Sequence, residues 1–368
     1  MHHALQQARL ALTTGHTHDA VLHANIAAGL ARSLNDLPAH AQAKTLLVQL
    51  LFNLGRVAEA LRHGHELLLG AMALNDGPGL VRTQTRLALA LSEAGLHARG
   101  EALAAAAHDE ASRRGLHALQ TEALLMRGAL LGRLGQAAAG EQLLQDGLAR
   151  AQEAGDDALS LSALNSLLVL LLSAHDEALE AGDTAQARLC RQRLRRCLPQ
   201  ALAQGMREGD VLKRALLRSN AGAALRVLGS LADAEALLRG CVQASQSAGF
   251  SACELRARIR LADVLIDRGC LEAAQQEIET VHSLRLLEPQ AATALDGLRL
   301  QWRRALASGD IAMAGALRSQ LEACRADEAA RREAALQHAE SALGHLLDQL
   351  APLPGAARHG ALPRLRRC

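Results

Sequence analysis

Aromatic side chains are scarce in this chain of 368 residues, which contains two phenylalanines, one tryptophan and no tyrosine. Hydrophobic residues nevertheless make up 49% of the sequence, so a large core has to be almost purely aliphatic. The scarcity also removes the stacking platforms on which single-stranded nucleic acids lie. With 40 basic and 38 acidic residues, the chain lacks the positive excess of a general nucleic-acid binder. Nucleic acid is therefore the weaker of the possible partners.

Segments for export or membrane insertion are also missing. The amino-terminal residues MHHALQQARLALTTGH contain no uninterrupted apolar stretch, and the longest apolar run, LLVLLL at 167–172, is far below the ~20 residues of a spanning helix. The seven cysteines are an odd number and include no C-x-x-C pair, which fits a reducing compartment. We expect a cytoplasmic protein with no membrane segment.

Motifs of catalysis and of cofactor binding do not occur. The absence of any Gly-Lys dipeptide excludes a phosphate-binding loop. HELLL at 65–69 resembles the start of a zinc-protease motif, but Leu69 stands where the second histidine ligand is needed. His175 and Asp176 offer an imidazole beside an acid, yet no nucleophile or oxyanion hole accompanies them. We predict a non-catalytic protein without a metal or cofactor.

Glycine, in contrast, recurs at a regular period. Successive members of one glycine series are separated by 40, 40, 40, 47, 47, 40 and 40 residues, and an alanine or glycine stands five residues after each. The series consists of Gly15, Gly55, Gly95, Gly135, Gly182, Gly229, Gly269 and Gly309. A fixed period in this range is typical of solenoid repeats.

Each of these glycines separates two stretches of about twenty residues with helical apolar spacing. Glycine adopts a left-handed conformation at low cost, so we expect it to end one helix and begin the turn to an antiparallel second helix. The small residue five positions later then allows the two helices to pack closely. A second set of helix breakers closes most units: Asn35-Asp36, Asn75-Asp76, Gly115, Gly155-Asp156, Gly249 and Glu288-Pro289. Eight two-helix units are predicted.

The segments LLVQLLFNLGRVAEALRHGHELL and NAGAALRVLGSLADAEALLRGCVQAS resemble tetratricopeptide (TPR) repeats. The resemblance implies an all-α, right-handed α-solenoid of about eight repeats over residues 1–325. It also implies a concave groove, lined by the first helix of each pair, that holds a protein or peptide segment. The period of 40 exceeds the usual ~34 residues, so HEAT-type repeats of ~40–47 residues remain the alternative.

The fifth repeat is longer than the others, because 27 residues separate Gly155 from Gly182 where other repeats have 20. Seven extra residues are two helical turns, which predicts an extended hairpin over 156–209. Its second arm carries a cluster of arginines: Arg188, Arg191, Arg193, Arg195 and Arg196. The cluster is either a docking patch for an acidic partner or a solvated face that pairs with the acids of the first arm.

After Gly309 a helical pattern continues for about forty residues. Within residues 326–351, an apolar 3-4 spacing resembles a short coiled-coil seam. Its members are Leu336, Ala339, Leu343, Leu346 and Leu350. This segment is either a cap on the last repeat or a signalling helix that forms a homodimer. Residues 352–368, rich in Pro, Arg and Ala, are expected to be disordered.

A TPR array followed by ARREAALQHAESALGHL also resembles the amino-terminal half of bacterial diguanylate cyclases, where such a helix leads into a catalytic GGDEF domain. That domain is absent from this sequence. Two functions therefore stay open: a non-catalytic interaction or sensory scaffold, and the regulatory region of a c-di-GMP signalling enzyme. The TPR region of a transcriptional regulator is a third, although no basic recognition helix stands out.

Overall fold

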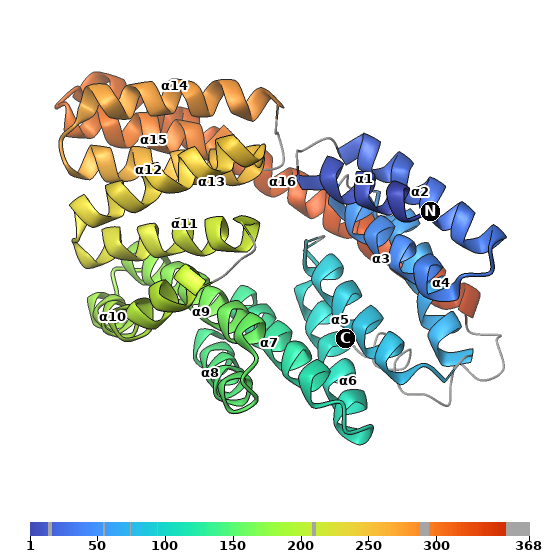
Figure 1. The fold of residues 1–368 in the computed structure, drawn as a ribbon. Coiled ribbons are helices and arrows are strands. Elements are labelled where there is room, and N and C mark those ends of the chain that lie inside the picture. The colour runs from blue at the N-terminus through green and yellow to red at the C-terminus, as the bar shows by residue number, and fades with distance from the viewer. Residues whose placement is uncertain are drawn as a thin grey trace. The chain divides into compact units, whose positions relative to one another are not determined.

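The computed structural model describes residues 1–13, 17–53, 56–73, 75–93, 95–207, 211–287 and 294–350. Within these ranges the chain forms sixteen α-helices and no β-strand (Figure 1). The helices follow one another as pairs, with an odd-numbered first helix and an even-numbered second helix. The predicted all-α, helical-repeat solenoid is therefore confirmed.

The pairs are α1 (His2–Thr13) with α2 (Thr17–Ser33), α3 (Leu37–Asn53) with α4 (Val57–Ala73), α5 (Gly77–Glu93) with α6 (His97–Arg113), α7 (His117–Arg133) with α8 (Ala137–Glu153), α9 (Asp157–Glu180) with α10 (Thr184–Arg207), α11 (Val211–Leu228) with α12 (Leu231–Ala248), α13 (Ser251–Asp267) with α14 (Leu271–Leu287), and α15 (Ala294–Ala307) with α16 (Ile311–Leu350).

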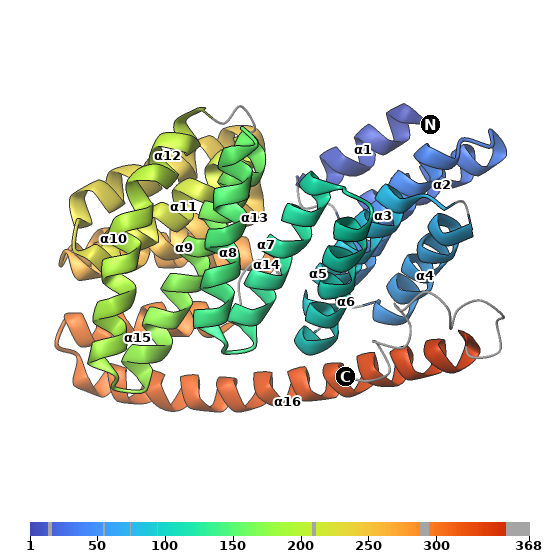
Figure 2. The same ribbon diagram turned by 90° about the horizontal axis from the view of Figure 1, so that it is seen from below.

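The chain divides into two compact units. Unit 1 comprises Met1–Leu12, His16–Ala163 and Arg332–Cys368, and unit 2 comprises Thr13–Gly15 and Leu164–Arg331. Within each unit, consecutive helices stack side by side in chain order (Figure 1, Figure 2). First helices of neighbouring pairs also contact each other, α3 with α5 and α5 with α7 in unit 1, and α11 with α13 and α13 with α15 in unit 2. The first helices thus form a continuous layer within each unit.

The turn glycines end the first helices as the sequence predicts. Gly95 has a φ of +87°, in the left-handed region that costs glycine little. The N–H of Leu96 donates to the carbonyl oxygen of Leu91 at 2.9 Å, which satisfies a carbonyl group at the helix end in a Schellman motif. The same positive φ occurs at Gly135, Gly182, Gly229, Gly269 and Gly309. Gly15 and Gly55 lie outside the described residues.

Small residues five positions after the turn glycines pack against the preceding helix. Ala234 and Ala274 are fully buried. At Gly100, a Cβ atom would lie 2.6 Å from the backbone carbonyl oxygen of Ala88 on α5, closer than real Cβ atoms approach. The helices therefore approach closely at this position, and the prediction that a larger side chain pushes them apart follows from that geometry.

The second set of helix breakers closes the second helices. Asn35 and Asn75 adopt left-handed φ values of 54° and 50°, and Gly115, Gly155 and Gly249 do so as well. Asx caps start several of the following helices; for example, an Asp36 carboxylate oxygen accepts the N–H of Ala39 at 3.0 Å. The predicted breaker at 288–289 lies outside the described residues.

The core is aliphatic, as the composition requires. All of the largest fully buried side chains in the described residues are leucines, including Leu91 in unit 1 and Leu238 in unit 2. Trp302 on α15 is only half-buried and packs beside the buried Ala305 and Leu317. Stability therefore comes from leucine and alanine packing between neighbouring helices.

Three helices are much longer than the 17-residue helices that are commonest in the array. The helices α9 and α10 each contain 24 residues, and Pro199 lies inside α10. The last helix, α16, runs for 40 residues. The side chains of the predicted seam on α16 and the whole of residues 352–368 lie outside the described part of the structure.

Among the described helices, α9 is long and apolar enough to cross a membrane by length and composition alone. Of its most apolar stretch, 56% is buried inside the protein. A core helix of a folded protein passes the same test of length and composition, because many of its apolar side chains are covered by neighbouring helices.

Candidate functional site

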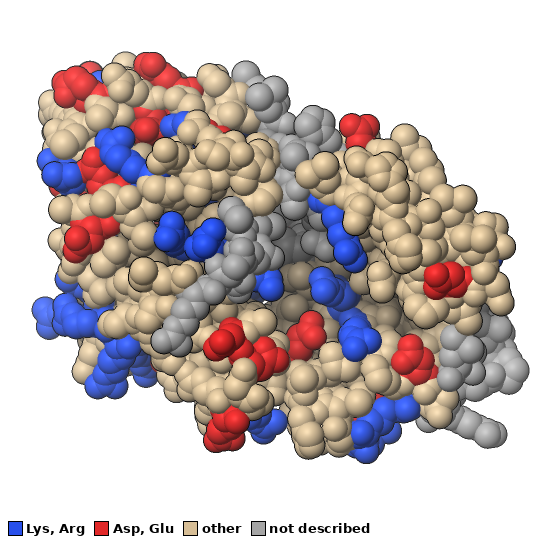
Figure 3. Space-filling model, viewed as in Figure 1, with Lys and Arg blue, Asp and Glu red and all other residues tan. Residues whose placement is uncertain are grey.

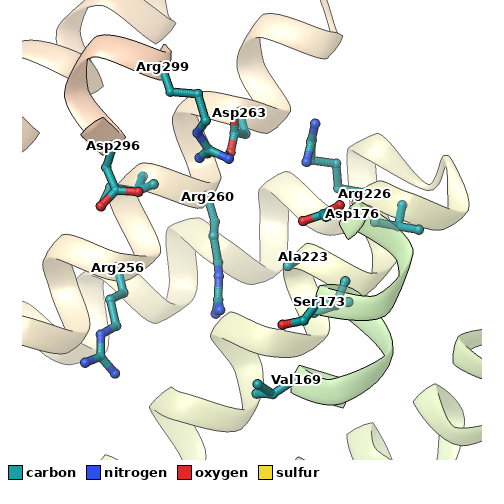
Figure 4. A pocket seen from close by; sticks show the side chains of 13 residues that line it. Val169, Ser173, Asp176, Ala223, Arg226, Arg256, Arg260, Asp263, Asp296 and Arg299 are labelled. Carbon is teal, nitrogen blue, oxygen red and sulfur yellow. Dashed lines mark hydrogen bonds and ion pairs between the residues drawn. The ribbon is translucent and has the colours of Figure 1, made fainter. Parts of the chain in front are cut away.

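A cavity of about 300 Å³ opens on the layer of first helices in unit 2. Four successive first helices contribute to it, α9, α11, α13 and α15, so the cavity is a product of the repeat architecture (Figure 4). We call it the unit 2 cavity. Its charged lining residues are Asp176, Arg226, Arg256, Arg260, Asp263, Asp296 and Arg299. Its apolar lining residues are Val169, Leu172, Ala223, Val227 and Ile259.

Helical spacing explains how each element presents these side chains. On α13 the lining residues are Arg256, Ile259, Arg260 and Asp263, which follow an i, i+3, i+4, i+7 pattern. The lining residues of α9, numbered 169, 172, 173 and 176, repeat that pattern. Residues at this spacing lie on one face of a helix, so the faces of neighbouring first helices converge on the same space.

Part of the charge in the cavity is neutralised within the layer. Asp263 is 4% exposed and accepts a hydrogen bond from Nη2 of Arg299 at 3.0 Å and another from Arg303. Asp267, one turn further along α13, accepts a bond from Nε of Arg226 at 2.6 Å and pairs with Arg303 as well. These contacts tie α11 and α15 to α13.

Arg226 illustrates the balance of forces in this network. Burial acts to lower the pKa of Arg226, but the negative charges of Asp263 and Asp267 outweigh it, so the pKa lies above its ordinary value. The guanidinium group therefore stays charged, and it acts as a fixed cation on the wall of the cavity.

Arg260 has a different environment. Its Nη1 donates to the hydroxyl oxygen of Ser219 on α11 at 2.6 Å, and no carboxylate oxygen lies within 4.0 Å of its nitrogens among the described residues. Burial, assisted by the positive charge of Arg256, lowers the pKa of Arg260 to about 10. Nearby, Nε of Arg299 is buried and has no hydrogen-bond partner in the described part of the chain. The cavity thus contains cationic donors that its own acids do not fully satisfy.

The arginine cluster predicted from the sequence lies elsewhere, on α10, and none of its members lines the unit 2 cavity. Basic side chains gather over α10 at the lower left of Figure 3. Within the described chain, Arg188, Arg191, Arg195 and Arg196 are exposed and form no ion pair. Arg193 is half-buried.

The acids of the facing arm do not pair with those four exposed arginines. Asp176 instead contacts Nδ1 of His175 at 3.3 Å. These four arginines therefore form an exposed basic ridge along α10.

The residues of the unit 2 cavity were not singled out by sequence reasoning. The sequence does contain a signal for them. Arg256, Arg260 and Asp263 stand at i, i+4 and i+7 of a first helix, although the core of the array is mainly apolar. Charge at that spacing indicates a polar strip on the layer of first helices. Which side chains from α9, α11 and α15 face the strip is decided by packing between repeats.

No group of three or more His, Cys, Asp or Glu side chains in the described ranges is placed to hold a metal ion. The six described cysteines are all free thiols. Cys241 is buried, and its Sγ donates to the carbonyl oxygen of Ala215 at 3.2 Å, as a small hydrophobic residue with a weak donor does.

Two solved structures align with this chain. The crystal structure of a Rap protein complexed with Competence and Sporulation Factor aligns over 99% of this chain and 95% of that chain, with a TM-score of 0.54 and 11% identity. The crystal structure of BtubC (BKLC) from P. vanneervenii aligns over 62% of this chain and 90% of that chain, with a TM-score of 0.46 and 20% identity. No family model matches the sequence, and no curated protein does. The likeness to the Rap protein concerns the fold alone.

Proposed function

We propose that this chain is a non-catalytic interaction module, built from TPR-type repeats, that binds a protein or peptide segment at the unit 2 cavity. One observation carries the proposal: four successive first helices converge on a single space that is lined by both apolar and charged side chains. A layer of first helices is the surface on which helical-repeat proteins bind extended segments.

The composition of the cavity supports this function. Ligand sites combine an apolar lining with a few polar groups that fix orientation, and here Val169 and Ile259 lie among four arginines and three aspartates. The Rap protein with the similar fold was solved in complex with Competence and Sporulation Factor, which is a precedent for ligand binding by this architecture.

We further propose a cytoplasmic role as the regulatory region of a bacterial signalling protein, in which α16 serves as the signalling helix. The supporting feature is its length of 40 residues, far beyond the 17 residues of an ordinary helix in this array. Sedimentation velocity of the full chain tests the dimer that this role implies. We expect a species of twice the mass of one chain, and a monomer at micromolar concentration contradicts it.

Selection of peptides tests the binding function. A phage library of random peptides is selected on the full chain, and the affinities of individual binders are measured by fluorescence anisotropy. Ala223 is half-exposed and lines the cavity, so Ala223→Trp fills the space with an indole ring. Ala236 is exposed on the second helix α12, so Ala236→Trp makes the same change away from the cavity.

We expect Ala223→Trp to weaken binding roughly tenfold or more, because it occupies the volume that the ligand needs. Ala236→Trp should leave affinity unchanged. If the selected peptides bind both variants with equal affinity, the binding surface lies outside the unit 2 cavity. Failure to select any binder would contradict the proposed function.

A further inference from the structure

The unit 2 cavity contains positive charge that its own acids do not neutralise. Asp263 is engaged by Arg299 and Arg303, and Asp176 by His175. The third acid, Asp296, also has a partner of its own. Two cations remain. Within the described residues, neither Arg256 nor Arg260 has a carboxylate oxygen within ion-pair distance.

These two arginines are neighbours on α13. They stand four residues apart, which places their Cβ atoms about 6 Å from each other on one face of the helix. Like charges at this spacing repel each other, and here the repulsion adds to the cost of burying Arg260. An anion bound beside them would offset this repulsion. It would also replace the favourable interactions with water that Arg260 loses on burial.

The donors of Arg260 suit a carboxylate. A guanidinium group has five N–H donors, and within the described ranges the one hydrogen-bond partner of Arg260 is the neutral hydroxyl of Ser219. A carboxylate can accept two parallel N–H bonds from such a planar fork. In Figure 4 the Arg260 side chain projects from α13 into the space that the lining residues surround. Arg256 is exposed, so it adds charge at the mouth of this space.

The size and walls of the cavity restrict the ligand. About 300 Å³ lies at the lower end of the range for ligand pockets, ~300–1,000 Å³, so the cavity accommodates one side chain or one chain end. Val169 is 44% exposed and, with Ile259, offers an apolar surface for a short methylene stem. An acidic side chain, with its apolar stem and charged tip, matches both features.

We propose that Arg256 and Arg260 anchor a carboxylate group of the bound peptide, either an Asp or Glu side chain or the free carboxyl terminus. Arg260 supplies the paired N–H donors, and Arg256 supplies a second positive charge that holds the anion. This inference rests on the proposed function, because it assigns the ligand chemistry of the same cavity.

Nuclear magnetic resonance of the arginine Nε–H groups tests the anchor directly. The full chain is prepared with isotope-labelled arginine, and the Arg260 signal is identified by its absence in Arg260→Lys. Three small probes are titrated: acetyl-glutamate amide for a side-chain carboxylate, acetyl-alanine for a terminal carboxylate, and acetyl-glutamine amide as the neutral control. We expect at least one carboxylate to shift the Arg260 signal saturably, whereas the neutral control leaves it in place.

Two variants that each remove one positive charge distinguish binding at the cavity from non-specific electrostatic attraction to the protein. Arg256→Gln removes the second cation from the site, and Arg188→Gln removes an exposed, unpaired arginine on α10. We expect Arg256→Gln to weaken carboxylate binding roughly tenfold, since charge-assisted hydrogen bonds and the local charge are lost. Arg188→Gln should have no effect. Because Arg256 is exposed, its variant folds even if changes at Arg260 disturb packing.

The outcomes distinguish this inference from the proposed function. An Arg260 signal that does not respond to either carboxylate, or a response that Arg256→Gln leaves unchanged, overturns the carboxylate anchor. If selected peptides are nevertheless blocked by Ala223→Trp, the cavity binds peptides by other chemistry and the proposed function stands. If carboxylates shift the signal but no peptide is selected, the anchor stands and the proposed function fails. Comparison of the two carboxylate probes identifies which source the site prefers.

Discussion

Nε of Arg226 on α11 donates to a carboxylate oxygen of Asp267 on α13 at 2.6 Å, across 41 residues of sequence. Arg226 stands three residues before its turn glycine, and Asp267 stands two residues before the next. In unit 1, Ser92 and Arg133 occupy the same two positions and are joined by a hydrogen bond of 2.8 Å, again across 41 residues. Corresponding positions of successive first helices therefore contact each other in both units. The contact is an ion pair in unit 2 and a hydrogen bond between arginine and serine in unit 1.

The ion pairs beside the unit 2 cavity provide a first prediction. Asp263→Asn removes a buried charge that Arg299 and Arg303 both contact. Arg299 then loses this counter-ion, while Arg303 keeps its contact with Asp267. We expect the free energy of unfolding to fall by about 2 kcal/mol, less than for a fully buried pair because both arginines are partly exposed. Urea unfolding followed by circular dichroism measures the change.

A matched acid-to-amide change serves as the control for Asp263→Asn. Glu322→Gln disrupts the pair between Arg318 and Glu322 on α16, whose side chains are 71% and 62% exposed. Solvated pairs contribute little, so the expected loss is below about 0.5 kcal/mol. Equal losses for the two variants would show that Asp263 has no special structural role.

Backbone conformation at the turns provides a second prediction. Gly229 has a φ of +86°, whereas Gly240 lies within α12 with no heavy atom near the position of an added Cβ. Gly229→Ala should destabilise the protein by about 1 kcal/mol because alanine is strained in the left-handed region. Gly240→Ala should stabilise it by about 0.5 kcal/mol because alanine favours a helix interior. Thermal unfolding midpoints that move in the same direction for both variants contradict this account.

Close packing between α5 and α6 provides a third prediction. Gly100→Ala places a methyl group 2.6 Å from the Ala88 carbonyl oxygen, so the helices have to separate. We expect a loss of about 2 kcal/mol, within the range for overpacked cores. Gly70 on α4 is exposed and has open space at its Cβ position, so Gly70→Ala is the control and should not destabilise the protein. Urea midpoints of the two variants provide the comparison, and tolerance of Gly100→Ala would refute the close contact.

Thiol reactivity provides a fourth prediction. Burial raises the pKa of the Cys253 thiol to about 11. Only a small fraction of this side chain is therefore present as the reactive thiolate near neutral pH. At pH 8, iodoacetamide should therefore modify the half-buried Cys270 and Cys324 well before Cys253. Mass spectrometry of peptides from the alkylated native protein measures the order. In denaturing urea the three cysteines should react at similar rates, and fast native labelling of Cys253 argues against its burial.

The same thiol links stability to pH. The unfolded thiol ionises near pH ~8.5, whereas the folded protein retains the proton up to about pH 11. The folded state therefore binds this proton more tightly, and its contribution to stability is complete below pH ~8.5 and is lost as the pH rises through this window. Cys253→Ala should reduce the fall in stability between these pH values, as urea midpoints across the range would show.

Much of the fold follows from the sequence because its signals are local. The glycine at each turn and the small residue five positions later indicate a helix pair without any knowledge of the rest of the chain. Six of the eight predicted turn glycines have the expected left-handed φ, and the other two lie outside the described residues. The functional interpretation of the arginine cluster could not be derived in the same way, because exposure on a helix does not identify a partner.

The sequence by itself determined the helix pairs, the positions of the turns and the aliphatic character of the core, since φ preference and apolar periodicity are properties of short segments. Only the tertiary structure decided which charged side chains meet. Asp263 lies 36 residues from Arg299 and 40 from Arg303, and the register between stacked helices determines that they contact each other. The same register places Ser219 of α11, rather than a carboxylate, beside Arg260, because this contact comes from another repeat.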